Sequence, residues 1–171
     1  HQGAGATFIL AEIDRYFLLK KYVFIVRHPL QTIRSILNRL SLPGDQPAIS
    51  LEEVDPKWRY FFENGGGKGY VADLAHRWCQ ANAQYKWIFS PQCKLIKYED
   101  FQKDKVAVID ELALSLGLQP QKDISARLDH SYQPRGNAQV NLKSFFGPEN
   151  YAAILEICES PMKKLGYPAA E

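Results

Sequence analysis

The clearest pattern of apolar positions is an unbroken run from Tyr22 to Val26, rich in β-branched and aromatic residues. Such a run is long enough for one strand buried on both faces, as parallel sheets require. Helical spacing of apolar residues follows Pro29, a residue favoured at the first position of a helix. The expected stripe comprises Leu30, Ile33, Leu37 and Leu40. The pattern predicts a strand that ends at Arg27 and His28, followed at once by an amphipathic helix.

Similar patterns predict further elements along the chain. We expect a helix over Thr7 to Leu19, a long helix over Val71 to Phe89, a strand over Cys93 to Phe101 that ends in Tyr98-Glu99-Asp100, a helix after Asp104, a helix over Tyr151 to Cys158, and a last helix that starts at Ser160-Pro161. Asp104 suits an N-cap, and Gly117 suits the position just after a helix. The order predicts an α/β fold with a short parallel sheet flanked by helices and a helix-rich C-terminal half.

Composition narrows the class of protein. A length of 171 residues indicates one domain, and 46% apolar with 23% charged residues is ordinary for a globular protein. The net charge of +2 gives no support for a nucleic-acid or membrane-surface binder. No apolar run approaches the length of a membrane span and no signal peptide is visible, so we expect a cytoplasmic protein.

The cysteines and the chain start add two expectations. Cys79, Cys93 and Cys158 are far apart in the sequence and lack metal-type spacing, so we expect reduced, mostly buried thiols. The chain begins at His1, and Met162 is its only methionine. We interpret the sequence as a fragment or processed piece.

Candidate chemistry gathers around the first strand. Arg27 is expected at the carboxyl end of that strand, and Ser35 on the following helix. Ligands of open α/β sheets bind at that end of the strands. Arginine offers a planar fork of donors suited to phosphate, and serine adds a neutral donor. The two side chains can therefore converge on one small anion.

The arrangement of Arg27 and Ser35 resembles the 3′-phosphate-binding segment of the sulfotransferases that use 3′-phosphoadenosine 5′-phosphosulfate (PAPS), whose arginine and serine both grip the 3′-phosphate. KLIKYEDF followed by DKVAVIDELALSLGL is similar to a strand and helix of that family, which implies that Tyr98 lies near the nucleotide. Pro134-Arg135-Gly136 stands where the family has an Arg-Lys-Gly triplet that closes over the 3′-phosphate, but it lacks the lysine. The resemblance therefore implies a cofactor site of Arg27, Ser35, Tyr98, Arg135 and Gly136.

The resemblance also implies a fold and a reaction. The fold would be a partial P-loop-NTPase-like three-layer structure, and the reaction the transfer of a sulfuryl group from PAPS to a hydroxyl or amine of a small-molecule or glycan acceptor, with no metal. The loop that holds the 5′-phosphosulfate is expected upstream of His1, and no catalytic residue is assigned. We therefore expect this chain alone to be inactive and only marginally stable. Its two strands would face a gap or pair imperfectly, with their apolar side chains uncovered.

Other functions stay open. FIVRHP is similar to the strand–Arg-His-Gly start of the histidine phosphatases, in which a histidine, here His28, is the nucleophile; Pro29 replaces the glycine, and neither His76 nor His130 completes a second motif. A non-catalytic nucleotide-binding or interaction module is the other alternative. The glycines around Lys68 predict a surface loop or a phosphate contact, and the aromatic residues from Trp58 to Phe62 predict core packing or acceptor contact.

Overall fold

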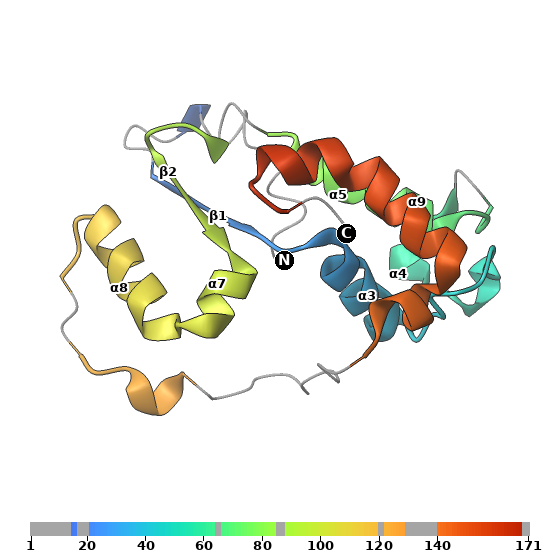
Figure 1. Ribbon diagram of the computed structural model, residues 1–171, viewed down its shortest axis with the longest axis horizontal. Coiled ribbons are helices and arrows are strands. Elements are labelled where there is room, and N and C mark those ends of the chain that lie inside the picture. Colours follow the sequence, from blue (N-terminus) through green and yellow to red (C-terminus); the bar gives the residue numbers. More distant parts are fainter. Residues whose placement is uncertain are drawn as a thin grey trace. The chain divides into compact units, whose positions relative to one another are not determined.

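A computed structural model describes residues 15–16, 21–63, 66–84, 88–119, 122–128 and 140–168. Figure 1 shows a mixed α/β structure that is mostly helical, with a two-stranded parallel sheet and a long C-terminal helix. This confirms the predicted α/β class and the short parallel sheet. The chain forms two compact units: His1–Arg27 with Ala81–Pro134, and His28–Gln80 with Arg135–Glu171. The helix expected over Thr7 to Leu19 lies outside the described residues, except for Arg15 and Tyr16, which are helical.

The sheet of the first unit pairs β1 (Tyr22–Val26) with β2 (Cys93–Lys97). The strands are parallel and in continuous register, from Tyr22 opposite Cys93 to Val26 opposite Lys97. The Tyr22 N–H also donates a hydrogen bond to the carbonyl of Gln92 (2.9 Å). The expectation of imperfect pairing is therefore wrong, because β1 pairs with β2 along its whole length.

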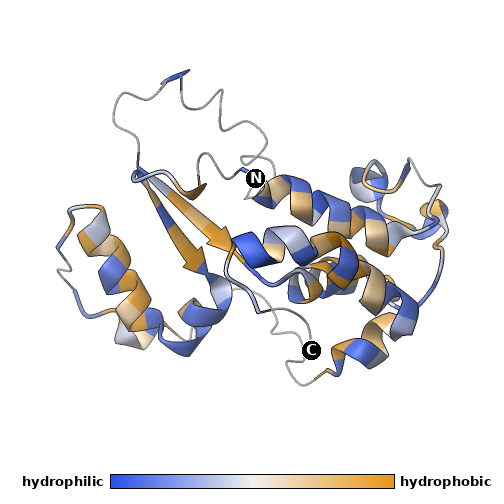
Figure 2. Ribbon diagram, turned by 45° about the horizontal axis from the view of Figure 1, so that its top comes forward, coloured by the Kyte–Doolittle hydropathy of each residue, from blue (hydrophilic) through white to orange (hydrophobic). Residues whose placement is uncertain are grey.

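Burial along β1 alternates between the two faces of the strand, as the pleat requires. Val26 is 1% exposed, whereas Val23 is 41% and Ile25 is 63% exposed. The prediction that β1 is buried on both faces is therefore wrong for Val23 and Ile25. The expectation that apolar side chains of the strands are uncovered is confirmed for these two residues. Figure 2 shows both strands as mainly apolar ribbons.

Two helices follow β2 in the first unit: α7 (Tyr98–Lys103) and α8 (Lys105–Ser115). The predicted strand therefore ends at Lys97 rather than Phe101, because Tyr98, Glu99 and Asp100 form the first turn of α7. Acidic side chains are stabilised there by the partial positive charge of the helix N-terminus.

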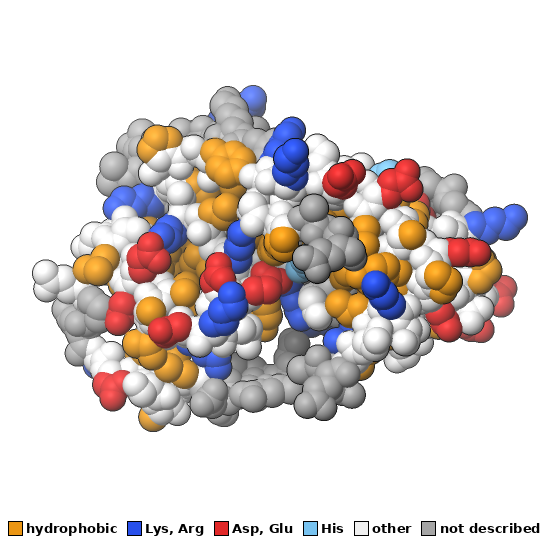
Figure 3. All heavy atoms as spheres, viewed as in Figure 1, with side chains coloured by type: hydrophobic (Ala, Val, Ile, Leu, Met, Phe, Trp, Pro, Cys, Tyr) orange, Lys and Arg blue, Asp and Glu red, His pale blue; other side chains and the backbone are white. Residues whose placement is uncertain are grey.

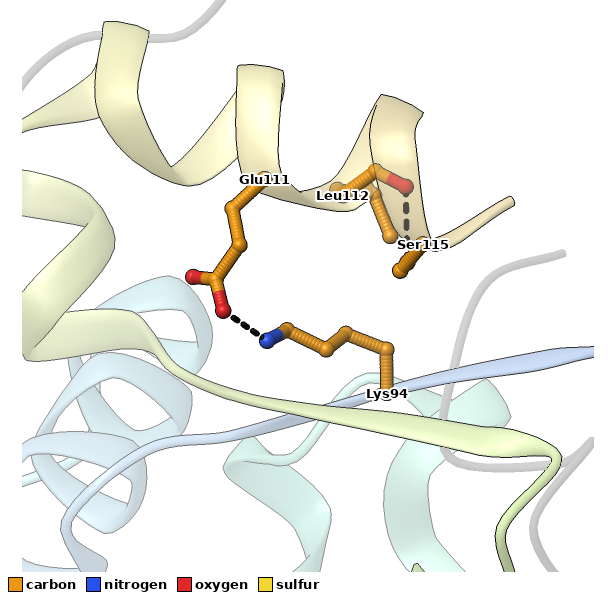
Figure 4. Close-up of polar contacts among 4 residues, drawn as sticks. All are labelled: Lys94, Glu111, Leu112 and Ser115. Atoms are coloured by element: carbon orange, nitrogen blue, oxygen red, sulfur yellow. Dashed lines mark hydrogen bonds and ion pairs between the residues drawn. The ribbon is translucent and has the colours of Figure 1, made fainter. Parts of the chain in front are cut away.

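The predicted caps of α8 are confirmed. The Asp104 carboxylate accepts a hydrogen bond from the Ala107 N–H (2.9 Å), and Gly117 adopts φ 75° just after the helix. Polar contacts hold α8 to the sheet side of the unit. Figure 4 shows Lys94 of β2 paired with Glu111 of α8. In a separate contact, Lys21 donates a hydrogen bond to the Ser115 carbonyl (3.1 Å). A short 3-10 helix, η3 (Ser125–Arg127), follows.

The second unit contains α3 (Pro29–Leu40), η1 (Leu51–Glu53), α4 (Pro56–Arg59), most of α5 (Tyr70–Asn82) and α9 (Leu142–Lys164). Helix α3 starts at the predicted proline and packs against α9. Leu30, Ile33 and Leu37 of the predicted stripe are buried, and Leu40 is half-buried. The predicted strand followed at once by an amphipathic helix is confirmed.

Two helix boundaries in this part of the chain differ from the predictions. Helix α5 ends at Asn82 rather than Phe89, and asparagine is a poor helix former because its side chain competes for backbone hydrogen bonds. Pro161 lies inside α9 instead of starting a new helix. Burial of Ile154, Cys158 and Met162 on one face of α9 offsets the hydrogen bond that proline cannot make. The only non-helical backbone inside α9 is at Gly147 (φ 66°, ψ 166°).

The core of the second unit is built by side chains of α3, α5 and α9 and of the segments between α3 and α5. Its fully buried large residues include Ile33, Leu37, Val54, Phe62, Tyr70, Val71, Phe146 and Ile154. Asn150 of α9 donates hydrogen bonds to the carbonyls of Gly44 (2.8 Å) and Gln46 (3.0 Å). Burial raises the pKa of Tyr70 to about 12, and its hydroxyl donates to the Pro43 carbonyl.

Two observations concern the surface charge and the possibility of a membrane span. On the face drawn in Figure 3, basic and acidic side chains are interspersed. No helix in the described part of the chain is both long enough and apolar enough to span a bilayer.

The glycine-rich segment offers a test of packing. Gly67 is buried at φ 85°, its N–H donates to the Phe62 carbonyl, and an added Cβ would lie 2.2 Å from the Ile49 carbonyl oxygen. Gly69 has a similar φ of 62°, with nothing within 4 Å of an added Cβ. We predict that Gly69→Ala costs about 1 kcal/mol of unfolding free energy and Gly67→Ala roughly 3 kcal/mol.

Urea unfolding of both variants measures this difference, and Gly69→Ala is the matched control for the left-handed backbone alone. Equal losses in the two variants would show that the backbone carbonyl of Ile49 does not restrict position 67.

Candidate functional site

Arg27 and Tyr98 occupy equivalent places at the carboxyl ends of the two strands. Arg27 directly follows β1, and Tyr98 directly follows β2 as the first residue of α7. Val26 is paired with Lys97, so the residues that directly follow these two, Arg27 and Tyr98, come together at the end of the sheet. Both side chains are half-buried. The parallel register thus brings together two residues that the sequence analysis assigned separately to one cofactor site.

The two side chains make a direct contact. The guanidinium carbon of Arg27 lies 4.8 Å from the centroid of the Tyr98 ring, over its face. A cation in this position is attracted by the electron-rich ring face, and contacts of this kind are worth about 0.5–1 kcal/mol at exposed sites and more where they are desolvated. The ring therefore favours a position of the guanidinium over its face. The planar fork of an arginine can bind phosphate or carboxylate with two parallel hydrogen bonds.

Ser35 belongs to the second unit, where it lies on α3. Its side chain is exposed, outside the buried stripe of the helix. Helix α3 has an N-cap without a side-chain hydrogen bond and no acidic residue in its first turn. Arg135 and Gly136, the remaining predicted cofactor residues, lie outside the described part of the chain.

Arg34 of α3 is a buried cation that is not part of the apolar stripe expected from the sequence. It is 7% exposed, and its guanidinium carbon lies 6.0 Å from the centroid of the Phe145 ring. Its position four residues after Leu30 and three before Leu37 puts it on the buried side of the helix. That spacing was the available signal for burial, but a charged residue is uncommon at a core position, so the charge of Arg34 argued against burial.

His28, the nucleophile of the phosphatase alternative, is the N-cap of α3 and half-buried. Its ring meets that of Tyr167 edge-on, with centroids 5.4 Å apart. Its carbonyl accepts hydrogen bonds from the backbone N–H (3.0 Å) and the hydroxyl (3.1 Å) of Thr32. These contacts account for His28 as a residue that positions the start of α3.

The neighbouring acids Glu99 and Asp100 lie at the start of the helix that follows β2. Both lie in the first turn of α7, where Asp100 is exposed and Glu99 half-buried. Asp100 forms an exposed ion pair with Lys103 (3.2 Å), an interaction of small energetic value. Their contribution is to the start of α7, which places Tyr98.

Asp73 is a titratable group that the sequence analysis did not single out. It lies in the first turn of α5, and its Oδ2 atom is buried without a hydrogen-bond partner among the described residues. Burial raises the pKa of this carboxyl, and the nearby charge of His76 partly opposes the rise. An aspartate between the apolar residues Val71 and Leu74, at the start of a predicted helix, was the signal for it.

Of the two predictions for the aromatic residues near α4, core packing is confirmed for Phe62 but not for the whole cluster. Trp58 and Phe61 are stacked with centroids 5.3 Å apart, and the Arg77 guanidinium lies 3.9 Å from the Phe61 centroid. Phe62 is fully buried, whereas Tyr60 is exposed. Among the described residues, no group of three or more histidine, cysteine, aspartate or glutamate side chains could hold a metal ion.

Comparisons of the chain with models of protein families, with curated proteins and with solved structures find no match. The function must therefore be inferred from the residues themselves, and above all from the contact between Arg27 and Tyr98.

That contact can be measured by a double-mutant cycle. We predict that Arg27→Ala and Tyr98→Leu are coupled by about 0.5–1 kcal/mol in unfolding free energy, because each removes one half of the cation–ring contact. Tyr98→Phe keeps the ring and should keep most of the coupling. Strictly additive effects of Arg27→Ala and Tyr98→Leu would contradict the geometry, as would a loss of coupling in Tyr98→Phe.

Proposed function

We propose that this chain carries the 3′-phosphate-binding half of a PAPS-dependent sulfotransferase, with Arg27 as the principal ligand of the phosphate. The observation that carries the proposal is the position of Arg27 over the Tyr98 ring, at the carboxyl edge of two parallel strands. Nucleotides bind at this edge in open α/β sheets. The order of strand, arginine and amphipathic helix around Arg27 supports the same assignment.

Each proposed ligand has a distinct physical role. Arg27 supplies a charged, planar pair of donors, and the Tyr98 ring contacts the guanidinium while offering an aromatic surface beside the bound nucleotide. Ser35 contributes a neutral hydroxyl donor, and Arg135 with the Gly136 amide contributes a second cation and a backbone donor. Most of the phosphate affinity therefore depends on arginine.

The activity that we propose is transfer of a sulfuryl group from PAPS to a hydroxyl or amine of a small-molecule or glycan acceptor. PAPS, when bound, supplies the activated sulfuryl group. The residues assigned here bind and orient the nucleotide, and none of them is assigned the deprotonation of the acceptor. The P-loop-NTPase-like three-layer fold belongs to the same proposal, which the parallel strands and the helix after Arg27 support.

The proposal makes a binding prediction. Arg27→Ala should weaken the affinity for 3′-phosphoadenosine 5′-phosphate about 30-fold, because loss of a charge-assisted phosphate contact costs about 2 kcal/mol. Ser35→Ala should weaken it only a few-fold, since a neutral hydrogen bond contributes about 1 kcal/mol. Isothermal titration calorimetry of the folded variants measures both effects.

Two controls make this measurement specific. Arg39→Ala removes an exposed arginine near the end of α3 and should leave the affinity within about two-fold. Adenosine 5′-phosphate, which lacks the 3′-phosphate, should bind wild type and Arg27→Ala equally weakly. If Arg27→Ala binds the bisphosphate as tightly as wild type, the assignment of Arg27 fails.

A second prediction separates sulfuryl transfer from phosphatase chemistry. His28→Asn should retain binding of 3′-phosphoadenosine 5′-phosphate, because the proposed ligands do not include the imidazole. It should cost only a modest amount of stability, through the lost edge contact with Tyr167. Calorimetry and thermal unfolding measure these two properties.

The phosphatase alternative predicts a covalent intermediate instead. Wild-type protein incubated with a phosphomonoester and quenched in base would then carry an acid-labile phosphate on His28, which mass spectrometry detects. Detection of this adduct would overturn the sulfotransferase proposal in favour of the phosphatase.

A further inference from the structure

Two of the three cysteines, distant in the sequence, meet in the second unit. Cys79 lies near the end of α5, Cys158 lies in the second half of α9, and they are 79 positions apart. Their sulfur atoms are 3.7 Å apart, and both are free thiols. Cys93, the third cysteine, opens β2 in the first unit.

The two thiols point across the interface between α5 and α9. The Cys79 thiol lies 3.4 Å from the Ile157 carbonyl oxygen of α9, and the Cys158 thiol lies 3.7 Å from the Ala75 carbonyl oxygen of α5. Each sulfur therefore reaches the backbone of the opposite helix.

The pair is chemically asymmetric. Cys158 is fully buried, whereas Cys79 is only partly buried. The hydrogen bond between the two sulfurs lowers the pKa of Cys79, and the same interaction together with burial raises the pKa of Cys158. A thiol that is more acidic and more accessible reacts first with oxidants.

We propose that Cys79 and Cys158 are a reversible redox pair, in which Cys79 is the peroxide-reactive thiol and Cys158 resolves it to a disulfide that links α5 to α9. In the first step the Cys79 thiolate attacks one oxygen of hydrogen peroxide. A sulfur–oxygen bond forms, the oxygen–oxygen bond breaks, and hydroxide leaves and takes up a proton as water.

In the second step the Cys158 sulfur attacks the sulfur of Cys79 sulfenic acid. The disulfide bond forms, the sulfur–oxygen bond breaks, and the departing hydroxide takes the Cys158 proton as water. Two thiols and one peroxide thus give one disulfide and two waters. The sulfurs must approach by roughly 1.7 Å to reach bonding distance, a shift that side-chain rotation and small helix movements can supply.

The disulfide would affect the stability of the part of the second unit that surrounds α9. Helix α9 packs on α3, and Asn150 of α9 donates a hydrogen bond to Gly44 in the loop that follows α3. A disulfide between α5 and α9 closes a long segment of chain, and closure of a long loop restricts the unfolded state. Oxidation therefore stabilises the packed arrangement of these helices.

The test uses the whole chain treated with a small excess of hydrogen peroxide. Free thiols are alkylated after unfolding, and a non-reduced digest is analysed by tandem mass spectrometry. We expect one cross-linked peptide pair that contains Cys79 and Cys158, its loss on addition of dithiothreitol, and an alkylated Cys93. The oxidised protein should unfold roughly 5–10 °C higher than the reduced protein.

Matched variants separate the proposed pair from general oxidation. Cys93→Ser should behave as wild type. Cys158→Ala should form no cross-link and accumulate sulfinic acid at Cys79, and Cys79→Ser should leave Cys158 as a thiol after peroxide treatment. Either of the last two variants suffices if the other fails to fold.

Three results would overturn the proposal. The first is that both thiols of the wild-type protein remain alkylatable after peroxide. The second is sulfinic acid at Cys79 beside an intact Cys158 thiol. The third is that Cys93 reacts first and joins two chains.

Discussion

The parallel register between β1 and β2 is the constraint on which the candidate site depends. Pairing of Val26 with Lys97 places Arg27 opposite Tyr98, where the guanidinium lies over the ring. A shift of one residue would turn every side chain of one strand to the other face of the sheet. The register is held by the backbone ladder, and α8 is tied to β2 through Lys94 and Glu111. The ladder ends at the residues directly before Arg27 and Tyr98, so it decides whether the two side chains meet.

Elements with a local signal were predictable from the sequence. Pro29 and the apolar stripe mark α3, and Asp104 and Gly117 mark the two ends of α8, because caps and periodicity act within a few residues. Helix and strand boundaries were predicted wrongly where the local preference of the sequence competes with other interactions. Tyr98 starts a helix although its sequence continues an extended run, and Pro161 stays inside α9 because burial of neighbouring side chains exceeds the cost of one missing hydrogen bond.

The residues of the candidate site were predictable to the same extent: single positions have a local signal, whereas contacts between distant segments do not. Arg27 was predictable as a strand-end cation, and the sequence placed Tyr98 near the end of the second strand. Their contact was not predictable, because it requires two strands about seventy positions apart to pair in one particular register. The same reason applies to Cys79 and Cys158, which the sequence described only as distant thiols. Arg34 shows the opposite case, since its helical position was known and only its charge argued against burial.

A two-stranded sheet is a weak support for a binding site, because isolated pairs of strands are only marginally stable in water. Val23 and Ile25 are exposed, so burial of apolar side chains stabilises β1 on one face only. The ion pair between Lys94 and Glu111 is largely exposed on its acidic side and adds little. An anion held by Arg27 beside Tyr98 would bind only while the strands are in register, and linkage then requires that binding stabilise the register. Affinity at the strand ends and stability of the sheet are therefore two measures of the same equilibrium.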